Sequence, residues 1–186
     1  PIREGSNVIT DADRAWWAFQ PLVKPDVPDV TADRWSRNGV DRFIYGRLAD
    51  EKMVPAARAE KEVLVRRLYF DLIGVPPTPD EMDAFVNDPS PYAWELLIDT
   101  LLEDPRYGEH WARFWLDLVR YAESDGWNKD SYRPHIWRYR DYVVNALNGD
   151  KPYPEFVRQQ LAGDEIEGDN PENLFATGYL RLGIYE

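Results

Sequence analysis

The densest group of side chains that could do chemistry lies between residues 104 and 141. This stretch holds both histidines of the chain and four of its eight tryptophans. A carboxylate close to an imidazole can fix its tautomer and raise its pKa, which suits general acid–base chemistry. The candidate catalytic residues are therefore His110, Asp117, Asp125 and His135.

A polar loop at residues 122–134 is the best candidate for ligand binding, because binding groups are commonly carried on loops between rigid helices. The loop supplies carboxylates, an amide and a tryptophan, and the next helix adds an arginine and an aspartate. Aromatic rings beside carboxylates suit sugar recognition, since a ring can stack on a pyranose and carboxylates accept its hydroxyl hydrogens. The candidate ligand-binding residues are Glu123, Trp127, Asn128, Asp130, Arg138 and Asp141.

Other interpretations of the same residues stay open. The carboxylates at 123, 125, 130, 164 and 165 could form an acid–base pair or an oxygen-rich cation site, although residues 125–130 lack the downstream glutamate of a calcium loop. The two histidines could bind a metal with Asp117, Asp125 or Asp130, although no spacing matches a zinc signature. The last interpretation is structural, with helices joined by ion pairs between residues three or four apart and a solvated loop. Arg113 with Asp117, and Arg138 with Asp141, have that spacing.

Composition excludes several classes of function. The chain of 186 residues carries 34 acidic and 22 basic side chains, a net charge of −12, which argues against binding nucleic acid or an anionic membrane. No apolar run is long enough to span a bilayer. The chain has no cysteine, so disulfides and covalent c-type haem attachment are excluded within it. No Ser-His-Asp order, phosphate loop or dinucleotide fingerprint is present.

Helical periodicity and start signals predict an all-α fold, an irregular array of about eight short to medium helices with an extended N-terminal arm. Thr78, Pro79 and Glu81 form the clearest start signal, a capping box with proline in the first turn. We expect helices starting near Val40, Glu60, Pro79, Tyr92, Pro105, Pro134, Pro154 and Pro171. The expected core includes Trp94, Leu97, Leu101, Trp111, Trp115 and Leu118.

The chain is predicted to consist of a Pro- and Trp-containing arm at residues 1–37 and a helical domain at 38–186. The arm holds the segment WWAFQPL, and we expect its aromatic side chains to anchor it on the helical body. Because Pro1 is not an initiator residue, we expect the chain to be a piece of a larger protein.

Four segments resemble those of a known family, namely RRLYFDLIGVPPTPDEMDAF, DPRYGEHWARFWLDLVRYAESDGW, RPHIWRYRDYVVNAL and QQLAGDE. Occurring in this order, they are similar to the planctomycete cytochrome-c-associated domain PSCyt2, also called DUF1549, over roughly residues 40–183. The resemblance implies a domain of uncharacterised activity in a large, exported or periplasmic protein. It also implies c-type haem elsewhere in that protein, and cytochrome c and PSD1 (DUF1553) domains as partners.

Three functions compete on these grounds. The first is a domain that docks a c-type cytochrome module, the second is a carbohydrate-binding or carbohydrate-processing domain with its site at the 122–134 loop, and the third is a structural scaffold. A ligand pocket containing His110, Asp117, Asp125 and Trp127 would favour the second function. A central region in which every charge is paired would favour the third.

Overall fold

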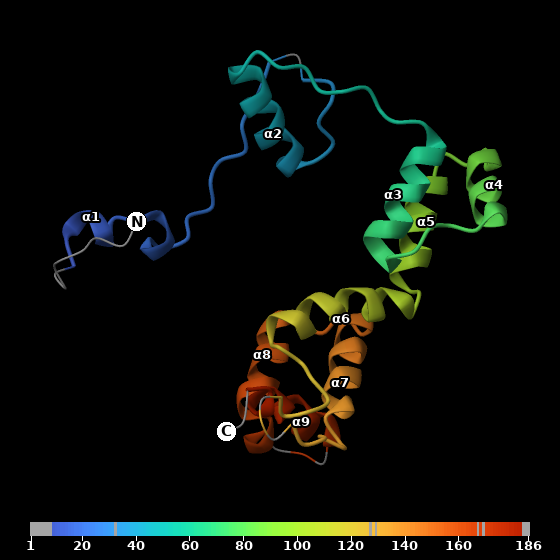
Figure 1. Cartoon of the computed structure of the whole chain (residues 1–186). Coiled ribbons are helices and arrows are strands. Elements are labelled where there is room, and N and C mark those ends of the chain that lie inside the picture. The colour runs from blue at the N-terminus through green and yellow to red at the C-terminus, as the bar shows by residue number, and fades with distance from the viewer. Residues whose placement is uncertain are drawn as a thin grey trace. The chain divides into compact units, whose positions relative to one another are not determined.

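The computed structural model describes residues 9–31, 33–126, 128, 130–166, 168 and 170–183. The chain divides into two compact units, residues 1–58 and 59–186, which are described separately below. Helices account for the regular structure of the described residues, and their only β contact is an isolated antiparallel bridge between Ser124 and Tyr132. The all-α prediction is confirmed (Figure 1).

The first unit contains two short helical turns and one longer helix. Helix α1 (Asp11–Arg14) begins with a capping box between Thr10 and Asp13, and η1 (Trp17–Phe19) is a 3-10 turn. Helix α2 (Gly39–Asp50) is capped by the side chain of Asn38. The tryptophans and phenylalanine of WWAFQPL are exposed, so packing inside this unit does not bury them, and their anchoring on the helical body stays a prediction.

Three helices build the first core of the second unit. They are α3 (Lys61–Ile73), α4 (Pro79–Asn87) and α5 (Ala93–Leu102). Thr78 and Glu81 form the predicted capping box of α4. Val65, Tyr69 and Ile73 repeat every four residues along α3, so they lie on one face of the helix. Together with Phe85, Ala93 and Leu101 they form one buried cluster.

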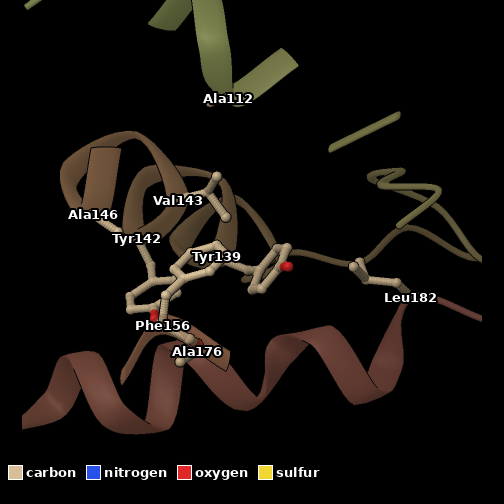
Figure 2. Close-up of a cluster of buried hydrophobic side chains, with 8 residues drawn as sticks. All are labelled: Ala112, Tyr139, Tyr142, Val143, Ala146, Phe156, Ala176 and Leu182. Carbon is tan, nitrogen blue, oxygen red and sulfur yellow. The ribbon is translucent and has the colours of Figure 1, made fainter. Parts of the chain in front are cut away.

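The second core lies among the helices that follow in the chain (Figure 1). They are α6 (Arg106–Leu118), α7 (Trp137–Asn148), α8 (Tyr153–Ala162) and α9 (Pro171–Ala176), with 3-10 turns η2 (Gly163–Glu165) and η3 (Thr177–Arg181). Tyr139, Tyr142, Val143 and Ala146 form the buried face of α7. Figure 2 shows Tyr142 lying against Phe156 of α8; their rings are stacked at 5.7 Å.

The predicted helix starts near Val40, Glu60, Pro79, Tyr92, Pro105, Pro134, Pro154 and Pro171 each have a helix within three residues. The loop predicted at residues 122–134 begins earlier than expected, because α6 ends at Leu118 and Arg120 adopts the left-handed conformation, with φ at 60°. That conformation ends a helix by a local reversal of the chain. The loop between α6 and α7 is therefore longer than expected.

The predicted list of core residues, which come from α5 and α6, is partly wrong. Leu101 is buried, and Trp94, Leu97 and Trp115 are half-buried, but Trp111 and Leu118 are 40% and 73% exposed. The buried positions of α6 are the small residues Gly108 and Ala112. A Cβ on Gly108 would lie 2.6 Å from the carbonyl oxygen of Val144, so α7 packs against this small-residue face and the large side chains lie beside it.

Candidate functional site

A groove of about 650 Å³ between α6 and α7 is lined by seven polar side chains. Helix α6 contributes residues at a spacing of three to four, so they share one face of the helix. Their partners come from α7 and from Tyr121 in the loop. The lining residues are Glu109, Ala112, Arg113, Leu116, Asp117, Tyr121, Arg140, Asp141, Val144 and Asn145.

Arg140 is the charged centre of this groove. Its guanidinium lies 2.9 Å from the carboxylate of Asp141 and 3.4 Å from that of Glu123. The hydroxyl of Tyr121 donates to Glu123 at 3.2 Å. Burial of Tyr121, reinforced by the negative charge of Glu123, raises the pKa of the phenol to about 12, so it remains a proton donor at neutral pH.

The carboxylate of Asp117, like that of Glu109 and unlike that of Asp141, has no hydrogen-bond or ion-pair partner among the described residues. It is exposed on the α6 side of the groove. A carboxylate in this position has its acceptor lone pairs free for a ligand. Of the four candidate catalytic residues, only Asp117 lines this groove, where it is joined by the candidate ligand-binding residue Asp141.

Asp125 closes the loop before α7. Its carboxylate accepts a hydrogen bond of 2.6 Å from Nε of Arg133, and Nη2 of the same arginine donates to the carbonyl oxygen of Gly183 at 2.8 Å. These contacts tie the loop to the segment after η3. Among the described residues, Asp125 therefore joins two parts of the fold and lines none of the cavities described in this unit.

His135 and Arg138 lie at a different place, a shallow cavity of about 340 Å³ next to α9. Arg138 stacks over the rings of Trp137 and Phe175, at 5.4 and 5.3 Å. Asp141, which is three residues from Arg138 in the sequence, pairs with Arg140 instead. The two candidate residues on α7 thus belong to two cavities.

The rest of the predicted ligand loop is only partly described. Trp127 lies outside the described residues, and Asn128 is exposed. Asp130 accepts a hydrogen bond of 3.1 Å from the backbone N–H of Gly126, so its carboxylate closes a tight turn. Glu123 is therefore the member of this loop that reaches the α6–α7 groove, through its contacts with Tyr121 and Arg140.

His110 lies where α3 meets α6, outside the groove. Its imidazole packs against Gly74, whose left-handed φ of 74° ends α3, and a Cβ at that position would overlap the ring. The ring also meets Trp111 and Phe114 edge-on. Burial lowers the pKa of His110; Arg113 acts in the same direction and Asp71 opposes them. These contacts are those of a packed, neutral histidine.

The lowered pKa of His110 predicts a loss of stability in mild acid. The folded state disfavours the charged imidazole, so the unfolded state binds more protons once the pH falls below about 6.5, the ordinary pKa of histidine. The stability that the neutral imidazole of His110 contributes is fully present above that pH, and it is lost as the pH falls through the pKa of His110 in the folded state. Urea unfolding between pH 7.5 and 5.5 should therefore show a steeper loss of stability in the wild type than in His110→Gln.

His135→Gln is the matched control for this experiment, because it removes the other histidine. Equal pH dependence in the wild type and in His110→Gln would contradict the packing of a neutral imidazole at this position. An NMR titration of the His110 ring gives a second, direct measurement of the same group.

The proposed oxygen-rich cation site is not assembled in the described part of the chain, where no three carboxylate or histidine side chains are close enough to hold a metal.

Sequence reasoning missed Tyr121 and Arg140 as groove residues. A signal was present in α6, where Glu109, Arg113 and Asp117 repeat every four residues and mark one polar face.

Comparison with known proteins gives one match. No curated protein and no solved structure is similar enough to the chain to be matched. A family model described as "PSCyt2: Protein of unknown function (DUF1549)" matches residues 39–186, which is well over half of the chain. The match begins at the first residue of α2 and includes every helix of the second unit. The chain therefore belongs to the PSCyt2 (DUF1549) family.

Proposed function

We propose that the groove between α6 and α7 binds a neutral, polyhydroxylated ligand of the carbohydrate class. The observation that carries this proposal is the convergence of Asp117, Tyr121, Arg140 and Asp141 on one open groove of about 650 Å³. Cavities of this volume are typical of small-ligand sites. The same groove offers both hydrogen-bond donors and acceptors, which is what a sugar hydroxyl requires, since it both donates and accepts.

The charge of the groove favours a neutral ligand over an anionic one. Three carboxylates line it, from Glu109, Asp117 and Asp141, against two guanidinium groups, from Arg113 and Arg140. Arg140 is already neutralised by Asp141 and Glu123. A uronate or sulfated sugar would meet a net negative surface, whereas neutral hydroxyls can donate to the free carboxylate of Asp117.

The apolar part of the groove suits the less polar faces of a sugar ring. Leu116 and Val144 line its floor together with the ring of Tyr121. A pyranose presents C–H groups on its faces and hydroxyls at its edges, so it needs apolar contact and hydrogen bonds in the same site. This combination favours a carbohydrate over a lipid, because a lipid chain cannot form hydrogen bonds with the five charged side chains that line the groove.

Asp117→Asn tests this site with little change of shape. Titration calorimetry with neutral hexasaccharides (gluco-, xylo- and mannohexaose) should detect binding of at least one of them, and oligogalacturonate should bind more weakly. The variant should bind the sugar at least about tenfold more weakly, since a hydrogen bond to a charged group contributes roughly 1.5–3 kcal/mol.

Asp99→Asn is the matched control, because Asp99 is another exposed helical aspartate and lies on α5, outside the groove. It should leave both affinity and melting temperature unchanged. Binding of a neutral sugar with equal affinity by the wild type and by Asp117→Asn would contradict the proposed site. So would preferential binding of the uronate.

Association with a c-type cytochrome module is the second candidate function. It is suggested by the family name PSCyt2 and is favoured by the net charge of −12, because an acidic domain attracts a basic partner. The chain itself has no cysteine and therefore no CxxCH motif for covalent haem. The same proposal includes haem elsewhere in a larger protein, a PSD1 partner domain and an exported location.

No helix among the described residues is long and apolar enough to cross a bilayer.

A further inference from the structure

A second surface lies on the opposite side of α6 from the polar groove, and most of the residues that line it are apolar or aromatic. It consists of two adjoining hollows of about 550 and 340 Å³, which share Trp115 and Tyr153. We call it the α6–α8 apolar surface (the helices are labelled in Figure 1). Its apolar and aromatic residues are Trp111, Phe114, Trp115, Leu118, Val119, Ala146, Leu147, Tyr153, Phe156, Val157, Leu161, Tyr179, Leu180 and Leu182.

Large side chains on this surface are exposed to water. Leu118 is 73% exposed, Phe114 51%, Tyr153 66% and Leu161 56%. They come from two helices but adjoin the same half-buried tryptophan, whose ring packs on Phe156 at 5.0 Å. A continuous apolar patch of this kind on a folded domain marks a site of interaction, because exposing it to water is unfavourable.

The charges on the α6–α8 apolar surface are of one sign. None of the residues that line its two hollows is an aspartate or glutamate, although acidic residues outnumber basic ones by 34 to 22 in the chain. Arg120 lines one hollow. Lys151 lines the other hollow, where it lies 3.7 Å from Glu172. Aromatic residues with arginine, and few carboxylates, are the composition of protein–protein interfaces.

The backbone of Arg120 gives a separate reason to regard its side chain as functional. Its φ of 60° is the left-handed conformation that ends a helix, a position where glycine is normally preferred. A residue with a side chain is less stable in this conformation than in the right-handed one. Nothing in the local backbone requires an arginine here, whereas a partner with carboxylates would use its guanidinium.

We propose that the α6–α8 apolar surface docks an amphipathic helix of a partner protein, with an apolar stripe on the surface and carboxylates facing Arg120. The positive edge selects the acidic character of this helix. A helix is favoured over an extended segment because its backbone groups are bonded internally. An extended segment would place unpaired N–H and C=O groups on a surface with few polar partners, since the one buried amide there, Gln160, is already bonded to Trp115, Tyr139 and Phe156.

Two synthetic helical peptides test the proposal against the intact chain. Both carry the same stripe of leucine and tryptophan at a spacing of three and four residues, and they differ in having glutamate or lysine beside the stripe. Fluorescence anisotropy at physiological salt, which screens the net charge of −12 beyond about 8 Å, should show the glutamate peptide binding at least tenfold more tightly than the lysine peptide. Leu118→Asp should abolish binding of the glutamate peptide, while Leu96→Asp, at an equally helical but distant exposed leucine on α5, should leave it intact.

Arg120→Gly separates the proposed function from stability. Glycine suits the backbone at this position, so the melting temperature should hold or rise, while the preference for the glutamate peptide should fall at least threefold. Equal binding of the two peptides, or no binding of either, would overturn the proposal. Concentration-dependent dimerisation that Leu118→Asp abolishes would assign the surface to a second copy of the chain instead. Sugar binding at Asp117 should be unchanged in Arg120→Gly, so the two sites are tested independently.

Discussion

Gly163→Ala should destabilise the second unit by about 3 kcal/mol, the upper part of the usual range for overpacking a core. Gly163 is buried where α8 passes into η2, and a Cβ there would overlap the carbonyl oxygen of Asn173 and lie 2.9 Å from its carbonyl carbon. Its φ of −63° is allowed for alanine, so backbone strain does not contribute. Most of the effect comes from contact with the main chain of α9, which no side-chain rotation can relieve.

Urea unfolding followed by circular dichroism at 222 nm measures this loss. Gly183→Ala is the matched control, because nothing lies within 4 Å of a Cβ built on Gly183 and its φ is not positive. The control should change the free energy of unfolding by less than about 0.5 kcal/mol. If Gly163→Ala unfolded at the same urea concentration as the control, the close approach of α8 and α9 would be incorrect.

Trp115→Ala has the second large expected effect, a loss of about 3–5 kcal/mol in the free energy of unfolding. The indole packs edge-on against Phe156, and its N–H donates to the hydroxyl of Tyr139 at 2.9 Å and to the side-chain oxygen of Gln160 at 3.2 Å. The tyrosine hydroxyl donates to the same oxygen at 2.6 Å. Removing the indole therefore leaves a cavity and takes one donor from a buried network.

Trp115→Phe distinguishes the two parts of this loss. It retains most of the apolar contact with Phe156 but removes the N–H, so its cost should be clearly smaller than that of the alanine variant. Leu118→Ala, on the same helix, is the control for an apolar side chain that is 73% exposed, and its effect should stay within about 0.5 kcal/mol. Equal losses of unfolding free energy for Trp115→Ala and Leu118→Ala would contradict the finding that α6 packs Trp115 against the core and leaves Leu118 exposed.

Together, these variants bear on both proposed sites, because α6 carries one on each side. Asp117 faces the polar groove, and Leu118, the next residue, belongs to the α6–α8 apolar surface. Adjacent positions on a helix are about 100° apart around its axis, so a single helix can separate a polar site from an apolar one. The stability of α6 in the core is therefore a condition for either function.

Local sequence signals determined the elements of this fold. Thr78 and Glu81 are three residues apart and their side chains cap the start of α4 by themselves, without help from distant residues. Gly74 ends α3 for a similar reason, since its left-handed conformation is available to glycine at little cost. Four sequence segments, which occur in the same order as in the PSCyt2 family, also identified that family, and the family model matches residues 39–186.

The tertiary structure decided which faces and partners those elements use. The spacing of Trp111, Trp115 and Leu118 indicates one apolar stripe, but α7 packs on Gly108 and Ala112, where the helices can approach most closely. Likewise, Asp141 pairs with Arg140 and not with Arg138, because Arg138 stacks on Trp137 and Phe175. Helical periodicity groups residues by angle around an axis, whereas packing selects among those groups by shape and by contacts between segments far apart in the chain.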